Sequence, residues 1–123
     1  MNYEIYWEQE GVFLKFRNAI TVYDIINADL LLRGDKRYDR ITYIIYDLLD
    51  IDSSNLSLEA PKMLANMDNV AYSWNNNIFN LFLTKDSYII NIINEYLEQV
   101  ENPKWQNIIL DSVEKARMRI NNL

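Results

Sequence analysis

The strongest structural signal in the chain is the run Ile41-Thr42-Tyr43-Ile44-Ile45-Tyr46-Asp47, which is almost entirely β-branched or aromatic. Such a run without polar alternation is typical of a strand that is buried on both faces of a sheet. It ends at an acid and leads into a polar segment that contains Asp50, Asp52, Ser53 and Ser54. Open α/β sheets bind ligands at the carboxyl ends of their strands, so this segment is the first candidate for a functional site.

The pattern on either side of this run predicts one α/β domain over residues 1–123. Strand-like residues flank the short connection Glu10-Gly11, which predicts an amino-terminal β-hairpin. Apolar residues recur at helical spacing in several segments. The expected helices begin near Thr21, Pro61, Asp86 or Ser87, and Ser112, and the expected strands are Tyr3 to Glu8, Val12 to Phe16, Ile41 to Asp47, Ile78 to Leu83 and Trp105 to Leu110.

These elements follow one another in the order β-β-α-β-α-β-α-β-α. Strands that are separated by helix-length segments require crossover connections, so the later strands should be parallel. The hairpin adds an antiparallel edge, and the expected fold is a mixed, mostly parallel β-sheet with about four helices. In this sheet Ile44 and Ile45 should both be nearly inaccessible, because a strand covered on both faces buries successive side chains.

The composition limits the classes of function. The chain has no histidine and no cysteine, which excludes imidazole bases, thiolate nucleophiles and sulfur or imidazole metal ligands. Its only glycines are Gly11 and Gly34, so it has no glycine-rich loop to hold a phosphate. The net charge of −6 argues against nucleic acid as a partner, because phosphate binding needs a basic surface. No cofactor is expected.

The chain is also expected to be cytoplasmic. Half of its residues are apolar, but no window approaches the roughly 18 to 20 uninterrupted apolar residues of a membrane span. The amino terminus Met1-Asn2-Tyr3-Glu4 lacks the basic and apolar regions of a secretory signal.

Two small basic groups stand near the expected carboxyl ends of helices, where cations complement the helix dipole. We expect solvated side chains in both groups, with a docking surface for an acidic partner as the alternative. The first group is Arg33, Lys36, Arg37 and Arg40, and the second is Lys115, Arg117 and Arg119.

Several features then point to a family. They are Trp7 in the opening strand, the Gly11-Val12 hairpin, the Thr21 helix, the Asp35-x-Arg37-Tyr38-Asp39 connection, the strand ending at Asp47, and the closing segment Trp105 to Ala116. Together they resemble the STAS domains, specifically the small stand-alone SpoIIAA-like proteins, over nearly the full chain. The better-known members are anti-sigma-factor antagonists that a partner kinase switches by phosphorylating a serine. The resemblance implies a non-enzymatic regulatory module whose partner is a kinase or a regulator of a sigma factor.

The family's phosphorylated serine stands in an Asp-Ser-Ser-Gly-Leu motif at the start of the helix after the central strand. Asp52-Ser53-Ser54-Asn55-Leu56 lies near that place, although Asn55 replaces the glycine and the interval from Asp47 is shorter than in the family. An Asp-Ser-Ser string is also ordinary turn and capping chemistry, so a structural loop, or contact with another ligand, is the alternative. The residues expected to form the regulatory or partner-binding loop are Asp47, Asp50, Asp52, Ser53 and Ser54.

The same acids match the first half of a calcium-binding loop, as Asp50-x-Asp52-x-Ser54. The second half fails, because Asn55 stands at the position of the tight-turn glycine and Pro61 at that of the bidentate glutamate. No metal site is expected.

A second candidate site is apolar. Related folds of the CRAL-TRIO type carry small apolar molecules, which makes a carrier or sensor of such a molecule the alternative function. Methionine and aromatic side chains of the second helix and the following strand could line a pocket, although such residues are more often plain core. The pocket residues expected in that case are Met63, Met67, Trp74, Phe79 and Phe82.

We rank a regulatory interaction module first, a carrier second and a carboxylate-dependent enzyme third. An enzyme should bring acids of strongly shifted pKa together in one cleft. The first strand carries Tyr3, Ile5 and Trp7 on one side. The other side carries Glu4, Tyr6 and Glu8, whose two acids protect the strand edge only partly. A homodimer that uses aromatic surface of the hairpin or of a neighbouring helix is expected.

Overall fold

The expected central strand is the middle strand of a five-stranded sheet in the computed structural model, which describes residues 1–71, 77–101 and 105–122. The strands lie side by side in chain order. The first two are antiparallel and all later neighbours are parallel, as the hairpin and the crossovers predict. The strands are β1 (Tyr3–Trp7), β2 (Gly11–Ala19), β3 (Tyr43–Asp52), β4 (Phe79–Leu83) and β5 (Gln106–Leu110).

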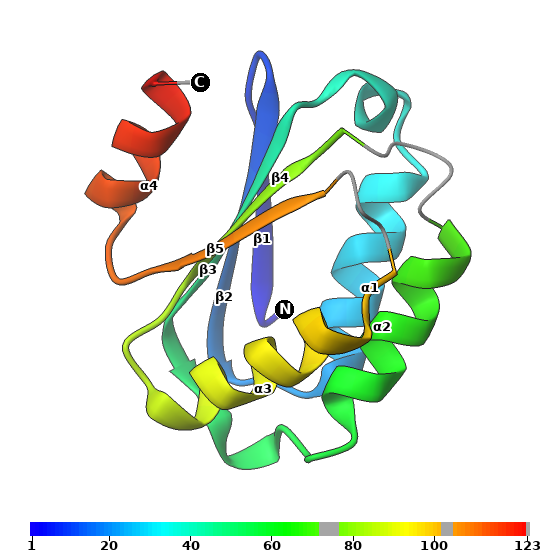
Figure 1. Cartoon of the computed structure of the whole chain (residues 1–123), viewed down its shortest axis with the longest axis vertical. Coiled ribbons are helices and arrows are strands. Elements are labelled where there is room, and N and C mark those ends of the chain that lie inside the picture. The colour runs from blue at the N-terminus through cyan, green and yellow to red at the C-terminus, as the bar shows by residue number, and fades with distance from the viewer. Residues whose placement is uncertain (72–76, 102–104, 123) are drawn as a thin grey trace.

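Helices cover both faces of this sheet (Figure 1). Three of them pack on one face and the carboxyl-terminal helix lies alone on the other. Two short 3₁₀ helices, η1 (Lys36–Arg40) and η2 (Ser53–Asn55), flank β3. The α-helices are α1 (Val22–Arg33), α2 (Ala60–Ala71), α3 (Ser87–Gln99) and α4 (Val113–Asn121). Within the described parts of the chain, no helix is both long and apolar enough to cross a membrane.

Successive residues of β3 are buried on opposite sides of the sheet. Ile44 is 3% exposed and belongs to the core under α1, α2 and α3. Ile45 is 0% exposed and belongs to the smaller core under α4. The prediction of a strand covered on both faces is therefore confirmed.

Polar side chains start the helices where the sequence predicts. The backbone amide of Thr21 donates to Asp24 Oδ2 at 2.9 Å at the start of α1. Asp86 accepts a hydrogen bond from the amide of Tyr88 at 2.8 Å, and Ser112 accepts one from the amide of Lys115. Each of these bonds satisfies an amide that has no partner within its own helix.

One expected boundary is wrong: β3 does not end at Asp47 but continues to Asp52. It pairs there with the long strand β2, with Arg17 opposite Asp50. The register shifts after Lys15 because β3 contains one extra residue, a β-bulge. Aspartate is rare in strands, so local propensity alone placed the end of this strand too early.

The inward face of α2 differs from one that would bury the two methionines expected in the apolar pocket. Pro61, Ala65 and Asp68 are buried, whereas Met63 and Met67 are only half-buried. The apolar pattern cannot indicate this orientation because one of the buried residues is an acid.

Replacing Ile44 by alanine should lower the free energy of unfolding by about 2–5 kcal/mol, because it removes buried methyl groups and leaves a cavity. Urea titration followed by circular dichroism measures this change. Leu31, which is 54% exposed, is the control, and Leu31→Ala should change stability by no more than about 0.5 kcal/mol. Equal effects of the two substitutions would contradict the assignment of β3 as the central strand.

Candidate functional site

The carboxyl ends of β2, β3 and β4 meet at one edge of the sheet, the lower edge in Figure 1. From this edge the chain enters α1, η2 and α3. Ser53 and Ser54 lie here, in η2 directly after the central strand. The serines therefore occupy the edge at which open α/β sheets bind their ligands.

Hydrogen bonds fix the η2 turn at both of its ends. Asp52 Oδ1 accepts a hydrogen bond of 2.9 Å from the amide of Ser54, and this bond lowers the pKa of Asp52. Leu56 is buried, and its carbonyl accepts a 2.7 Å hydrogen bond from the hydroxyl of Tyr88 on α3. Ser53 Oγ lies 3.4 Å from Asp86 Oδ2, whereas Ser54 is exposed. The turn presents the Ser54 side chain to solvent on a fixed backbone.

Asp47 and Asp50 form a separate group. Lys15 Nζ lies 3.3 Å from Asp47 Oδ2 and 2.9 Å from Asp50 Oδ2. Asp47 is 2% exposed and also accepts the amide of Leu49, so it belongs to the bulge of β3 and not to a loop. Within the described residues, no hydrogen bond or ion pair joins the side chains of these two acids to η2. The structure thus divides the expected site into a lysine-bridged pair, of which Asp47 is buried and Asp50 is exposed, and a separate exposed turn.

A cluster that the sequence did not predict lies between the sheet and helices α1, α2 and α3. The expectation of a solvated Arg33 is wrong, because its side chain is 6% exposed and forms an ion pair with Asp68. Asp68 also accepts a hydrogen bond from the hydroxyl of Tyr96. Asp29, one turn before Arg33 on α1, accepts a 3.2 Å hydrogen bond from the hydroxyl of Tyr46. Burial explains the arrangement, since a charge removed from water needs a partner.

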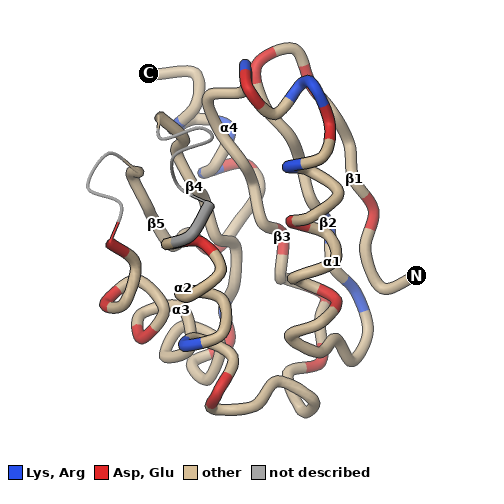
Figure 2. The backbone as a smooth tube through the Cα atoms, turned by 90° about the vertical axis from the view of Figure 1, so that its right-hand side faces the viewer, with Lys and Arg blue, Asp and Glu red and all other residues tan. Residues whose placement is uncertain are grey.

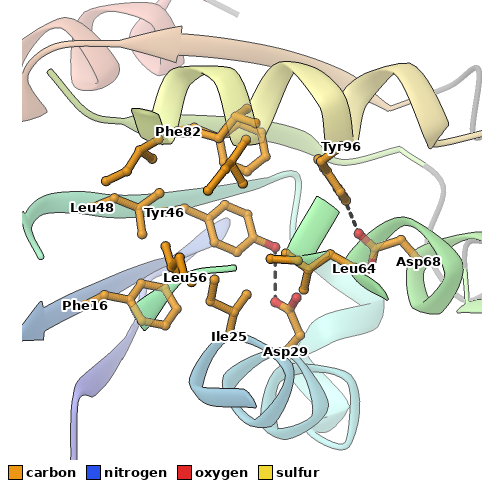
Figure 3. A pocket seen from close by; sticks show the side chains of 14 residues that line it. Phe16, Ile25, Asp29, Tyr46, Leu48, Leu56, Leu64, Asp68, Phe82 and Tyr96 are labelled. Atoms are coloured by element: carbon orange, nitrogen blue, oxygen red, sulfur yellow. Dashed lines mark hydrogen bonds between the residues drawn. The ribbon is translucent and has the colours of Figure 1, made fainter. Parts of the chain in front are cut away.

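This cluster borders a cavity of about 60 Å³ (Figure 3). The carboxyl groups and the tyrosine hydroxyls lie toward one end of it, and Phe16, Leu48 and Leu56 lie toward the other. The lining residues are Phe16, Ile25, Asp29, Tyr46, Leu48, Leu56, Ala60, Leu64, Asp68, Phe82, Ile89, Ile92, Ile93 and Tyr96. The cavity is therefore amphipathic.

Burial controls the charges around the cavity. Loss of hydration raises the pKa of Asp29 to about 7, and the negative charge of Asp68 acts in the same direction. Burial also raises the pKa of Asp68, and the nearby Arg33 guanidinium opposes that effect. Burial keeps the pKa of Tyr46 and of Tyr96 well above the usual value, so both hydroxyls are neutral donors.

The expected apolar pocket overlaps this cavity at one residue. Phe82 lines the cavity and stacks on Tyr46, with ring centroids 5.0 Å apart. Phe79 belongs to the core on the α4 face, because residues three apart in a strand point to opposite sides. Met63 and Met67 are not among the residues that line the cavity, and Trp74 lies outside the described residues.

Helical spacing gives a signal for the missed acids. Asp29 follows the inward-facing Ile25 by four residues, and Asp68 follows Leu64 by four residues, so each acid continues an apolar stripe. Arg33 in turn follows Asp29 by four residues. Charged residues on helices usually face water, so the sequence alone does not indicate that these acids and Arg33 are buried together.

Known structures share this fold. The anti-sigma factor antagonist SpoIIAA in its unphosphorylated form has a TM-score of 0.65 over 98% of this chain and 99% of that chain, at 10% identity. The Bacillus cell fate determinant SpoIIAA in the phosphorylated form has a TM-score of 0.58 over 96% and 98%, at 13% identity. No protein-family profile matches the sequence, and no curated protein matches it either. The predicted SpoIIAA-like α/β fold is confirmed, and identity this low shows the fold alone.

The Arg33–Asp68 pair should be essential for stability. Arg33→Met keeps most of the apolar stem but leaves two buried carboxyls without their cation, and breaking a buried pair in this way costs about 3–5 kcal/mol. Denaturant unfolding at neutral pH measures the loss. Arg40 is exposed, so Arg40→Met should have almost no effect. A loss below about 1 kcal/mol for Arg33→Met would mean that the pair is solvated.

Asp29 should make the protein less stable as the pH rises. Its pKa is about 7 in the folded chain and about 3.9 in an unfolded one, so the native state holds the extra proton between these values. Stability should fall across this window and level off above it. Asp29→Asn should remove this dependence and be more stable than the wild type at pH 8.

Thermal midpoints measured from pH 4 to pH 8 test this expectation. Asp39 is an exposed acid, so Asp39→Asn should follow the wild-type curve. Parallel curves for the wild type and Asp29→Asn would show that Asp29 titrates normally.

Proposed function

We propose that the protein is a non-enzymatic regulatory module that binds a protein partner at the carboxyl edge of its sheet, with phosphorylation of Ser54 as the switch. The observation that carries this proposal is the exposed Ser54 side chain in η2, directly after the central strand of a SpoIIAA-like fold. One structure with this fold is that of a phosphorylated SpoIIAA. The partner would be a kinase or a regulator of a sigma factor, in a cytoplasmic setting.

Exposure favours Ser54 over Ser53. A kinase must reach the hydroxyl, and Ser53 is half-buried with its Oγ beside Asp86. Asp52 already holds the amide of Ser54, so the backbone is fixed before a partner arrives. Rigid presentation of one side chain suits recognition, because little ordering entropy is lost on binding.

A phosphate at Ser54 would change the surface more than the fold. It adds about −1.5 to −2 charge near Asp52 and Asp86. Acidic segments predominate over basic ones at this edge (Figure 2). Within the described residues neither of these two acids has a salt-bridge partner, so both contribute negative charge near the phosphate. The added charge would therefore repel an acidic partner surface or attract a basic one.

Intact-mass analysis of the protein isolated from its own cells tests the switch. We expect a species that carries one phosphate, which Ser54→Ala abolishes and the control Ser57→Ala retains. Ser54→Asp should keep the thermal midpoint within a few degrees, because an exposed side chain carries little packing, and it should change partner affinity relative to Ser54→Ala. Phosphate on a different residue, or equal partner binding by the two variants, would refute the proposal.

The cavity favours a second candidate function, the carrier or sensor of a small molecule. Its volume of about 60 Å³ is well below the roughly 150 Å³ of an engineered cavity that binds benzene. Only a ligand of a few atoms fits without rearrangement. The same limit weighs against an enzyme, although two acids of raised pKa do meet here.

The homodimer stays a proposal. β1 is an edge strand of the sheet, and Tyr6 on it is 47% exposed. This edge is the surface that a second copy would use.

A further inference from the structure

The carboxyl groups at the cavity are not balanced by cations. Asp68 has an ion pair with Arg33, whereas Asp29 has none among the described residues. Asp29 is 6% exposed, and its Oδ1 accepts the hydroxyl of Tyr46. Its second oxygen, Oδ2, accepts no hydrogen bond from the described residues and is not fully enclosed, and Asp29 lines the cavity. A carboxyl oxygen of a largely buried acid is thus open to a donor in the cavity.

We propose that this cavity binds a short primary amine as its ammonium ion, with the ammonium on Asp29 and the alkyl group among the apolar side chains at the other end. This inference goes beyond the regulatory function and does not depend on phosphorylation of Ser54. It gives the second candidate function a ligand class.

The lining selects this chemistry over others. An anion would meet two carboxyls, and a neutral apolar molecule would leave Asp29 Oδ2 without a donor, which is costly in a buried site. A divalent metal needs about six oxygen ligands, and no group of three acidic residues that could hold one occurs in the described residues. An ammonium ion supplies several N–H donors and keeps an apolar tail.

Aromatic rings around the acid add to the attraction. Tyr46 and Phe82 are stacked, and Tyr96 meets Phe82 edge to face at 6.2 Å between centroids. All three line the cavity. The faces of such rings attract cations, and more strongly where water is excluded.

The cavity volume sets the length of the amine. A volume of about 60 Å³ is less than half of the roughly 150 Å³ of an engineered cavity that binds benzene, so a ligand of only a few non-hydrogen atoms fits. Ethylammonium, with three non-hydrogen atoms, is therefore a suitable probe. The ceiling on binding energy per atom makes roughly millimolar affinity the tightest expected for a ligand of this size.

Titration of the full-length protein with ethylammonium chloride, followed by amide chemical shifts in NMR at constant ionic strength, tests the proposal. At pH 8 we expect saturable shifts at Asp29, Tyr46 and Phe82, and much weaker binding of ethanol and of acetate. Asp29→Asn should lower the affinity at least tenfold, while Asp39→Asn should leave it unchanged. Leu64→Phe, which fills the cavity and keeps the acid, should also abolish binding.

The pH dependence is a second readout. The ammonium needs the ionised carboxylate, so lowering the pH from 8 to 6 through a pKa of about 7 should weaken binding about tenfold. The groups that face Asp29 and share in this titration are Arg33 on α1, Tyr38 in η1, Tyr46 on β3, Asp68 on α2 and Tyr96 on α3.

Three results would overturn the proposal: no saturable shifts at amine concentrations far above millimolar, ethanol binding as tightly as ethylammonium, or unchanged affinity in Asp29→Asn. If no amine binds while the stability of the protein still depends on the ionisation of Asp29, then Asp29 is a protonated structural acid and not a ligand site. None of these results bears on the phosphate at Ser54, so the two proposals fail separately.

Discussion

Strand β3 is covered on both faces, and this requires the chain to supply an apolar layer on each side of the sheet. On the α4 side the layer is thin: one helix packs on a few residues such as Ile45 and Leu81. On the other side three helices are needed, and they meet one another as well as the sheet. The cavity lies on the second side, where helices α1, α2 and α3 all approach Tyr46.

The buried polar cluster at the cavity joins these three helices to one another and to the sheet. Arg33 comes from α1, Asp68 from α2 and Tyr96 from α3, and their contacts fix the three helices against each other. Replacing a buried ion pair by apolar residues is often neutral or stabilising, so such a pair is weak evidence of a need for stability. Burial raises the pKa of a further acid, Asp29, so its ionisation costs stability as the pH rises. The polar end of the cavity therefore positions the three helices, although well-packed apolar residues of similar volume could stabilise the fold as well.

Local sequence patterns were sufficient to predict the strands, the hairpin and the helix starts of this fold. The apolar run of β3, the hairpin connection and the capping residues Thr21 and Asp86 each depend on neighbours in the chain, and the structure confirms them. The continuation of β3 to Asp52 depends on the length of β2, which pairs with it from a distant part of the sequence. Burial of Arg33 and Asp68 likewise depends on two helices meeting in space. No local pattern contains this information.

The two proposed sites share one segment of the chain. Leu56 lines the cavity with its side chain, and its carbonyl holds Tyr88 at the start of α3. The same residue is the carboxyl-terminal cap of η2, so Ser54 is only two positions away. A molecule in the cavity would touch Leu56, and a phosphate on Ser54 would act on the same turn. If a ligand binds one arrangement of η2 more tightly, phosphorylation that favours this arrangement would raise the ligand's affinity, because a larger fraction of the protein would already be in the state that the ligand prefers.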